Sequence, residues 1–246
     1  ANEGVKTLYV QVRDQAGNMS TAGSDTIQYM KLPVLSAATT SSLENVTDAY
    51  YRFPGTDITG ITAVKFGAAT LTSTLADDWY QGYFRTISDT VLYVYPPQGL
   101  VSGNYAVTPV NPAGTGTGLS VAVTYPTARR LRCPTQIKGG KALNVLCHRG
   151  TMPALTLSLL TLSADPNPSV FPGLISLSHG GLFGPTFLVW PILITHNGTT
   201  GAARWTTNVP AGVPSVRVYF QAAMIDPASP NITPIRVSER DDVLLY

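Results

Sequence analysis

Charged side chains are scarce in this chain. Asp, Glu, Lys and Arg make up 12% of the 246 residues, roughly half of the ~25% usual for soluble domains. Apolar residues make up 44%, and the mean hydropathy is +0.11, which leaves enough apolar material to fill real cores. Intrinsic disorder is excluded, because it requires low hydrophobicity and high net charge.

Helical periodicity and long apolar runs are also missing. No stretch of helical length repeats apolar residues at i, i+3, i+4 and i+7, so we expect helices of one or two turns at most. The most apolar stretch, Leu182–Thr195, is broken by Pro185 and Pro191 and is too short to span a bilayer; we expect a buried strand or strand pair there. Residues 1–6 are polar and charged, so we expect any signal peptide to have been removed or to lie outside this fragment.

Cysteine occurs only twice, at Cys133 and Cys147. With the adjacent His148 they fall short of the three or four ligands of a metal site, so we expect no metal and no other cofactor. A disulfide is the preferred interpretation, because it would close a loop of about 15 residues, contribute roughly 3 kcal/mol in the chain-entropy model and suit a secreted protein. The alternative is a pair of buried free thiols.

The small net charge of +2 hides an asymmetry. Residues 1–128 carry six Lys and Arg against nine Asp and Glu, whereas residues 129–246 carry ten against five. The basic excess gathers in 129–149, at Arg129, Arg130, Arg132, Lys138, Lys141 and Arg149. Since no exposed aromatic residues or nucleic-acid motif accompany it, we interpret it as a solvated basic loop and expect no nucleic-acid partner.

What recurs along the chain is strict alternation of apolar side chains between turns. It is found at 8–12, 91–95, 119–123 and 216–220, and alternation of this kind places one set of side chains on one face of a strand. The chain also holds 22 glycines and 19 prolines, which supply the turns. This pattern predicts an all-β chain of tandem antiparallel β-sandwich domains.

Two proline-marked junctions, around Pro33 and Pro126, divide the chain. Proline stiffens a connection and removes a backbone donor that could pair out of register. The predicted segments are 1–30, 31–127 and 128–246.

In the first segment, a strand over residues 6–13 ends in the turn Arg13-Asp14-Gln15-Ala16-Gly17-Asn18, and a second short strand follows at 26–29. This resembles the last two strands of the bacterial immunoglobulin-like domains that repeat along large surface proteins. We expect a structural turn here, because one Asp and one Asn fall short of the six or more oxygens that calcium takes. A lone hairpin is not a domain, so we expect the chain to be a piece of something longer.

The same hairpin carries the predicted assembly strand. Leu8, Val10 and Val12 present an apolar face with too few partner strands to cover it. Unpaired strands invite strand addition, so we expect residues 1–30 to lie against another sandwich, in this chain or in a neighbouring copy. The opposite net charges of the two halves favour head-to-tail contact.

The middle segment contains four motifs in order: Phe53–Gly67, Ile87–Pro97, Gly103–Val107 and Asn111–Gly114. Together they resemble an IPT/TIG domain, an immunoglobulin-like sandwich of cell-surface receptors and bacterial surface proteins that also serves as a spacer in carbohydrate-active enzymes. The opening strand departs from the usual Gly and Ile by having Tyr50-Tyr51-Arg52-Phe53, which makes it more aromatic.

The last segment contains Thr200–Trp205, Val218–Pro227 and a closing strand. These resemble a recurrent C-terminal module of large secreted bacterial proteins, although Ser238–Asp242 stands where that module usually has Ser-Asn-Gly. Since the module has no assigned chemistry, the resemblance implies a β-sandwich and an extracellular location rather than an activity.

No nucleophile with an oriented base is evident. Ser176 and Ser178 beside His179 are the nearest candidates, but adjacent residues of a strand point to opposite faces, and no Gly-x-Ser-x-Gly elbow occurs. His148 and His196 adjoin turn residues, so we interpret both as surface loop histidines.

Paired carboxylates for glycoside hydrolysis are also lacking. Asp77-Asp78 and Asp241-Asp242 are adjacent pairs in hydrophilic turns, which we interpret as solvated or turn-capping residues, and Asp226 precedes a proline at the end of a strand. We therefore expect no catalytic residue and no enzymatic activity.

One aromatic stretch suggests binding. Trp79, Tyr80, Tyr83 and Phe84 lie among acids and amides in residues 76–85, and such rings stack on the apolar faces of sugars, which makes them candidate glycan-binding residues. The alternative, which we favour, is that the rings cover the end of a sandwich or a domain junction.

Together these features predict a non-enzymatic structural or adhesive segment of an extracellular, cell-surface bacterial protein, in the form of a subunit of a filament or surface layer. The expected partners are other copies of the chain, neighbouring domains of a longer chain, or a glycan. Two other functions stay open: a glycan-binding module, and ancillary domains of a secreted hydrolase whose catalytic domain lies elsewhere.

Overall fold

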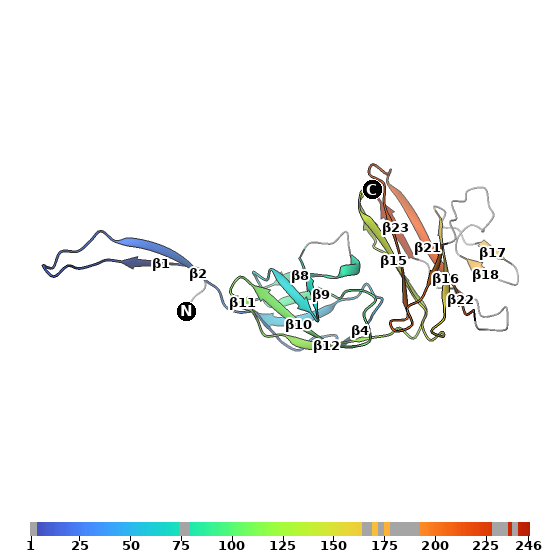
Figure 1. Cartoon of the computed structure of the whole chain (residues 1–246), viewed down its shortest axis with the longest axis horizontal. Helices are drawn as coiled ribbons and strands as arrows, with labels where there is room; N and C mark the ends of the chain where they lie inside the picture. Colours follow the sequence, from blue (N-terminus) through green and yellow to red (C-terminus); the bar gives the residue numbers. More distant parts are fainter. Residues whose placement is uncertain are drawn as a thin grey trace.

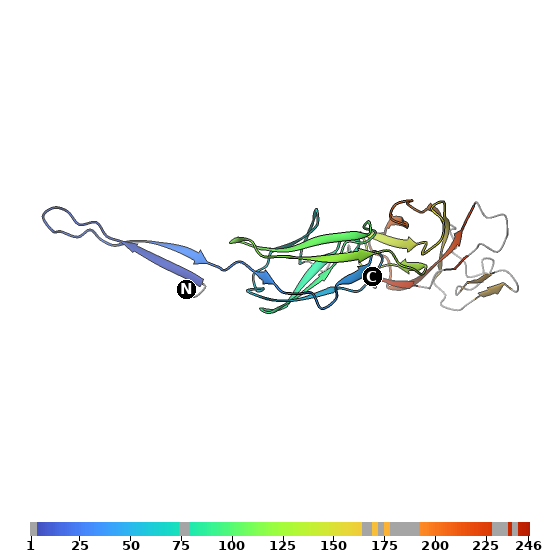
Figure 2. The ribbon, with the colours of Figure 1, turned by 90° about the horizontal axis from the view of Figure 1, so that it is seen from below.

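A β-hairpin and two β-sandwiches follow one another along the long axis of the molecule (Figure 1). In the second view the sandwiches lie end to end and the hairpin projects beyond the middle one (Figure 2). This computed structural model describes residues 4–73, 79–163, 169–171, 175–177, 192–227, 236–237 and 241–246. Within these ranges every regular element is a strand except one 3₁₀ turn, Trp79–Gln81, which confirms the all-β prediction.

The hairpin consists of β1 (Gly4–Val10) and β2 (Gly23–Tyr29), which pair antiparallel in one continuous register. The turn predicted at its tip is present. The Asp14 carboxylate accepts hydrogen bonds from the side-chain amide and the backbone N–H of Asn18, both at 2.8 Å, and these bonds lower the pKa of Asp14. Gly17 has a φ of +91°, which a residue with a Cβ rarely adopts.

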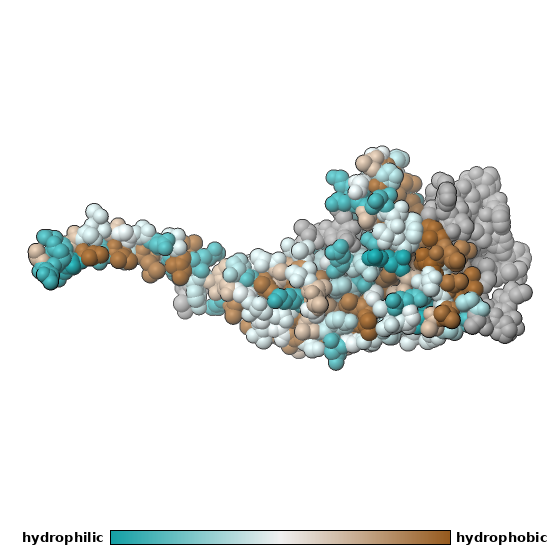
Figure 3. Space-filling view, in the orientation of Figure 1, coloured by the Kyte–Doolittle hydropathy of each residue, from teal (hydrophilic) through white to brown (hydrophobic). Residues whose placement is uncertain are grey.

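One face of this hairpin is apolar and uncovered, as Figure 3 shows. Leu8, Val10 and Val12 are 58%, 65% and 68% exposed, and the register places Ile27 on the same face. Every residue of both strands is exposed. The prediction that residues 1–30 lie against another sandwich of this chain is therefore wrong for the described part of the hairpin, which points away from both sandwiches. Contact with a neighbouring copy stays a prediction.

We expect the amides of β1 and β2 in the dilute protein to exchange with deuterium nearly as fast as those of an unfolded peptide. A two-stranded hairpin with no covered face is only marginally stable in water. Hydrogen exchange read by mass spectrometry checks this, with strand β10 (Gly103–Asn111) of the middle sandwich as the protected internal control. Protection in dilute protein would contradict the expectation, whereas protection that grows with concentration would indicate that a neighbouring copy covers the apolar face.

The middle sandwich has the strand order of an immunoglobulin fold. Its strands are β3 (Val34–Leu35), β4 (Ser42–Glu44), β5 (Tyr51–Thr56), β6 (Ala63–Phe66), β7 (Ala69–Leu71), β8 (Tyr83–Ser88), β9 (Val91–Tyr95), β10, β11 (Gly114–Thr115) and β12 (Leu119–Thr124). One sheet runs β3-β5-β9-β8 and the other β4-β12-β10-β6-β7, with β11 paired to β10. Lettered along the chain, the sheets are ABED and A′GFCC′, so the immunoglobulin-like prediction is confirmed.

Alternation along the strands fills the core between these sheets. In β9, Leu92 and Val94 are fully buried, while the residues between and beside them are half-buried on the outer face. The aromatic opening strand contributes Tyr51 and Phe53, both fully buried. The Tyr51 hydroxyl donates to the carbonyl of Ala122 on the opposite sheet at 2.5 Å, and burial raises the pKa of Tyr51 to about 12. This side chain therefore ties the two sheets together.

The C-terminal sandwich has a core of its own, around Leu131, Leu160 and Phe220. Its strands are β13 (Arg130–Arg132), β14 (Gln136–Ile137), β15 (Ala142–His148), β16 (Leu157–Ser163), β17 (Ser169–Phe171), β18 (Ile175–Leu177), β19 (Ile192–Thr195), β20 (Ala202–Asn208), β21 (Val216–Ile225), β22 (Arg236–Val237) and β23 (Asp241–Leu245). One sheet runs β13-β15-β20 and the other β14-β23-β21-β16-β19, with β22 paired to β21 and a separate β17–β18 hairpin. Of the apolar stretch 182–195, only β19 lies within the described residues; it is a strand as expected, but the expectation that it is buried is wrong, since its residues alternate between half-buried and exposed and Leu193 is 62% exposed.

The two cysteines of this sandwich are free thiols, so the preferred disulfide is absent and the alternative of two buried thiols is observed. Cys147 lies opposite Leu131 in the β13–β15 pairing. Cys133 comes two residues after Leu131, so Cys133 and Cys147 are diagonal neighbours across the two chain segments. Diagonal neighbours of an antiparallel pair are about 7–8 Å apart, beyond the Cα separation of ~7 Å that a disulfide spans. Burial raises the pKa of both thiols.

We expect neither cysteine to react quickly with iodoacetamide in the native protein. The thiolate is the reactive form, and burial disfavours it in both residues. Mass spectrometry after alkylation without reductant should show no adduct on the native protein and two adducts after unfolding in guanidinium chloride. An unfolded, unreduced protein that takes up no label and is lighter by two hydrogens would show that the disulfide forms.

Candidate functional site

The four rings of the predicted glycan site do not share one surface. Phe84 is fully buried in the core of the middle sandwich. Its neighbour Tyr83 points the other way and stacks on Tyr95, with ring centroids 4.2 Å apart and ring planes 10° apart. Trp79 and Tyr80, in the 3₁₀ turn, are half-buried against residues of the C-terminal sandwich. Half of the set therefore covers a domain junction, in agreement with the alternative that we favoured.

A small apolar cluster joins the two sandwiches at this point. It consists of Val46 from the middle sandwich and Leu146 and Ala202 from the C-terminal one, with Trp79 and Tyr80 packed against them. Beside it, the guanidinium of Arg204 in β20 lies 4.6 Å from the centroid of the Tyr80 ring, a cation–π contact. Apolar and electrostatic contacts thus meet on the same aromatic turn.

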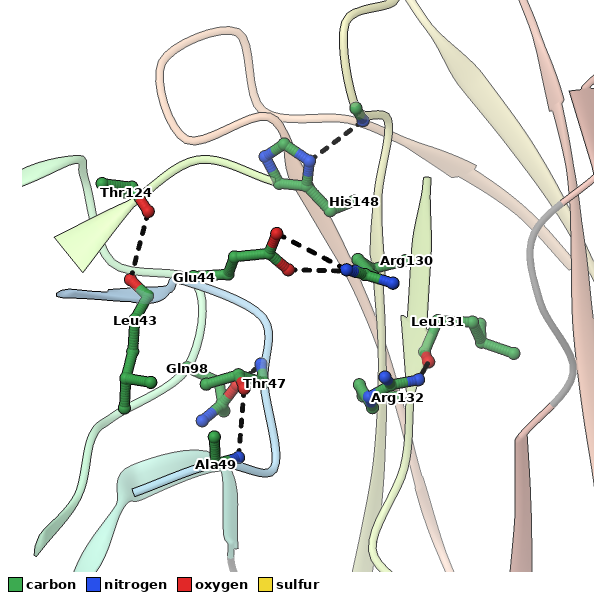
Figure 4. A network of polar contacts seen from close by, with 11 residues as sticks. Leu43, Glu44, Thr47, Ala49, Gln98, Thr124, Arg130, Leu131, Arg132 and His148 are labelled. Atoms are coloured by element: carbon green, nitrogen blue, oxygen red, sulfur yellow. Dashed lines mark hydrogen bonds and ion pairs between the residues drawn. The ribbon is translucent and has the colours of Figure 1, made fainter. Parts of the chain in front are cut away.

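An ion pair crosses the junction nearby (Figure 4). Arg130 donates to both carboxylate oxygens of Glu44, from Nε at 2.9 Å and from Nη2 at 3.5 Å, in the forked geometry that suits these two groups. The basic segment 129–149 is therefore not the solvated loop that we predicted. Arg130 and Arg132 lie half-buried in β13, and β15 is buried along nearly its whole length, because the segment supplies two strands of one sheet and β14 of the other.

Asn45 and Tyr125 reach one turn of the C-terminal sandwich. The Asn45 side-chain amide donates to the carbonyl of Leu100 at 2.8 Å and to the carbonyl of Thr200 at 3.2 Å, and Asn45 is 1% exposed. The Tyr125 hydroxyl donates to the carbonyl of Thr199 at 2.7 Å. Two successive carbonyls of the turn thus accept hydrogen bonds from outside their own sandwich.

His148 and His196 hold that turn from within, so the interpretation of both as surface loop residues is wrong. They are 1% and 3% exposed. His148 Nδ1 accepts a hydrogen bond from the Gly150 N–H at 3.0 Å, which leaves Nε2 to donate to the Thr200 carbonyl at 3.0 Å. His196 Nδ1 donates to the Gly201 carbonyl at 2.9 Å. Burial lowers the pKa of His148 to about 4 and also lowers that of His196, so both rings are neutral at pH 7.

A serine–histidine pair lies behind the turn. Ser158 Oγ is 2.6 Å from His196 Nε2, and because the proton of His196 is on Nδ1, the hydroxyl donates. This is the local geometry of an activated nucleophile, but Ser158 is 0% exposed and its strand lies between β19 and β21. No substrate reaches the hydroxyl, so the pair is structural. Sequence reasoning missed it because 38 residues separate the partners.

The other predicted candidates do not come together. Residues 77, 78, 178 and 179 lie outside the described part of the chain, and Ser176 is in the β17–β18 hairpin. Asp241 caps neighbouring backbone: its carboxylate accepts from the N–H of Cys133 at 2.7 Å and from that of Asp242 at 3.0 Å. Asp242 pairs with Arg217. Among the described residues, no three His, Cys, Asp or Glu side chains gather as metal ligands would.

Between the two sandwiches, next to the aromatic turn, lies a cavity of about 290 Å³. Both sandwiches line it, the middle one with aromatic and amide side chains and the C-terminal one with the segment that follows β13. The lining residues are Thr47, Asp48, Trp79, Tyr83, Tyr95, Gln98, Arg132, Cys133, Pro134 and Thr135.

No family model matches this chain, and no curated protein does either. Among solved structures, it is similar to the Bacteroides ovatus mixed-linkage glucan utilization locus SGBP-B in complex with a mixed-linkage heptasaccharide, at 12% identity and a TM-score of 0.30, over 100% of this chain and 54% of that one. It is also similar to the chicken CNTN1 FN1-FN3 domains, at 9% identity and a TM-score of 0.28, over 96% of this chain and 75% of that one. The chain thus spans about half the length of the first.

Within the described residues, no helix is long and apolar enough to cross a membrane.

We expect the free energy of unfolding to fall as the pH drops from about 6.5, the ordinary pKa of histidine, to about 4, the pKa of folded His148. In that window the unfolded chain binds protons that the folded chain does not, so stability rises with pH, by up to about 1.4 kcal/mol per pH unit for each histidine. Urea titrations at several pH values measure this slope. In the His148→Gln variant, the free energy of unfolding should depend less steeply on pH above pH ~5, where few carboxylates titrate. An unchanged slope would contradict the conclusion that burial lowers the pKa of His148.

Proposed function

We propose that this chain is a non-catalytic structural or adhesive segment of an extracellular surface protein, in which the middle and C-terminal sandwiches act as one stiff unit. The observation that carries the proposal is the junction, where an apolar cluster, an ion pair, a cation–π contact and two hydrogen bonds join the sandwiches. Domains with small polar interfaces move relative to one another by default. A junction with this many specific contacts is suited to prevent such motion.

The contacts arise from separate places on the middle sandwich. Glu44 and Asn45 follow one another at the end of β4, Tyr80 is in the 3₁₀ turn between β7 and β8, and Tyr125 follows β12. Glu44 meets β13 and Tyr80 meets β20, whereas Asn45 and Tyr125 both meet the turn at Thr199 and Thr200. Contacts spread over several segments resist rotation about more than one axis, which a single contact cannot do.

The chemistry of the described residues supports a role without catalysis. The one serine–histidine pair noted among them, Ser158 and His196, is sealed inside the C-terminal sandwich. The Asp241 carboxylate is used for backbone capping and Asp242 for an ion pair. A segment that holds other parts of a protein in place needs none of these groups to be accessible.

The immunoglobulin strand order of the middle sandwich supports an extracellular location. Residues 31–127 resemble IPT/TIG domains, and the flanking segments resemble parts of bacterial surface and secreted proteins. These resemblances support the more specific proposal that the chain belongs to a bacterial cell-surface protein. The uncovered apolar face of the β1–β2 hairpin and the opposite charges of the two halves support a subunit that assembles head to tail into a filament or surface layer.

We expect backbone residual dipolar couplings of the two sandwiches in the full chain to fit a single alignment tensor, because the junction fixes their relative orientation. The double variant Glu44→Gln with Tyr125→Phe removes the ion pair and one hydrogen bond of the junction, which together contribute on the order of 1–2 kcal/mol. Its two sandwiches should then need separate tensors, with each sandwich still folded.

The matched control is Asp57→Asn, which removes the ion pair of Asp57 with Lys31 at a site outside the junction. Asp57 has a φ of +56°, a conformation that Asn tolerates well. This variant should keep the single tensor. Two separate tensors in the unmodified protein would show that the sandwiches are flexibly tethered and that the proposal is wrong.

A further inference from the structure

The cavity at the junction has one strongly aromatic side. Tyr83 and Tyr95 stack face to face at 4.2 Å, and Trp79 lines the cavity beside them. Both tyrosines are half-buried, and burial raises the pKa of Tyr83 to about 12. Faces of aromatic rings offer apolar surface with a negative potential, which attracts the polarised C–H groups of a ligand lying flat on them.

A hydrogen-bond donor on the same wall is unused. The Nε1 atom of Trp79 is buried and has no acceptor among the described residues. Buried polar atoms are nearly always paired, and an exception calls for an explanation such as a ligand or an ordered water. Because this atom has almost no accessible surface, Trp79 offers the cavity its ring and not this donor.

The rest of the lining is polar and held in place. Gln98 is 5% exposed; its carbonyl oxygen accepts from the Thr47 N–H at 2.8 Å and its amide donates to the Pro96 carbonyl at 3.0 Å, as Figure 4 shows in part. Asp48 is exposed at the edge of the cavity. Thr135 adds a hydroxyl from the C-terminal sandwich. Fixed polar groups around an apolar face are typical of small-molecule sites.

The charged side chains of the lining add up to no formal net charge. One carboxylate, Asp48, and one guanidinium, Arg132, contribute to it. Since these two charges are opposite, the lining favours neither an anion nor a cation, which suits a neutral polar molecule. The molecule must have an apolar face for the rings and hydroxyls or amides for the polar side.

We infer that this cavity is a binding site for one ring of a neutral oligosaccharide. A pyranose ring has a face of C–H groups that can lie on the aromatic wall, and its hydroxyls both donate and accept, so they can reach the polar side chains of Asp48 and Thr135. The volume of about 290 Å³ lies at the lower end of the range for small-molecule sites, which suits a single ring. This site goes beyond the structural role, which does not depend on its occupancy.

Since both sandwiches line the site, a bound sugar would also contact both. A ligand that binds only when the two halves of a site are together stabilises that arrangement by mass action. Sugar binding should therefore raise the melting temperature of the protein and stabilise the relative arrangement of the two sandwiches. The junction contacts hold that arrangement in the absence of sugar as well.

The test begins with the full chain on an array of neutral and acidic oligosaccharides, followed by titration of the best neutral hit into ¹⁵N-labelled protein. The indole N–H signal of Trp79, identified by its loss in Trp79→Phe, should shift on titration. The signal of Trp205, whose ring packs against Phe220 in the C-terminal core, should stay in place and serves as the internal reference.

Variants separate binding from folding. Tyr95→Ala removes part of the aromatic wall, and Tyr93→Ala is its matched control, because Tyr93 is on the same outer face of β9, stacks on Tyr50 and does not line the cavity. We expect about a tenfold loss of affinity for Tyr95→Ala and for Trp79→Phe, and no change for Tyr93→Ala. Asp48→Asn, at an exposed position, should weaken binding without altering the melting temperature.

Each outcome decides the matter. A neutral hit that shifts Trp79 and weakens in Tyr95→Ala and Asp48→Asn but not in Tyr93→Ala supports the inference. Retention of no neutral oligosaccharide at millimolar concentration, retention of acidic ones alone, or binding that Tyr95→Ala and Asp48→Asn leave unchanged would each overturn it. The stiffness of the junction is measured separately by residual dipolar couplings, so the result of the sugar-binding test neither supports nor contradicts the structural proposal.

Discussion

The relation between the two sandwiches depends on one short turn, residues 197–201, and on two histidines that stay uncharged beneath it. The Thr200 carbonyl of this turn accepts one hydrogen bond from His148 in its own sandwich and another from Asn45 in the middle sandwich. The turn can come this close to His148 only because residue 201 is glycine: a Cβ there would lie 2.5 Å from His148 Nε2, and the φ of +68° also favours glycine. Neutral imidazoles suit such a site, since a buried charge without a partner would be costly.

Scarcity of charge gives each charged group of the junction a defined use. With charged residues at 12% of the chain, the surface of the middle sandwich has few ways to orient its neighbour, and the forked pair of Glu44 and Arg130 is one of them. Arg204 contributes through the face of Tyr80 instead of through a carboxylate. Aromatic and amide side chains take the place that salt-bridge networks would have in a more charged protein, so the junction should be less sensitive to salt than an interface held by exposed ion pairs.

The hairpin is the opposite case. Its register and its Asp14–Asn18 turn are complete, yet its apolar face is bare, so local rules are satisfied while the condition for stability, burial of that face, is not. In the middle sandwich the same alternation pattern is buried on one side of every long strand, because a second sheet lies within reach. The hairpin and the middle sandwich together show that alternation of apolar residues specifies a strand, whereas the stability of that strand requires a second sheet that covers its apolar face.

The sequence by itself determined the all-β class, the strands and the tip of the hairpin, because these follow from period-two alternation and from the turn preferences of Gly, Asp and Asn, which act within a few residues. The immunoglobulin-like fold of the middle segment was indicated instead by its resemblance to IPT/TIG domains. Only the tertiary structure decided the rest. It buried His148 and His196, which local turn signals placed at the surface, and it paired His196 with Ser158 across 38 residues. It set Cys133 and Cys147 on a diagonal of the β13–β15 register, a geometry that spacing along the chain does not reveal. It also divided the aromatic stretch 79–84 among a core, a junction and a cavity wall, since the direction of each ring depends on which sheets meet there and not on the residues beside it.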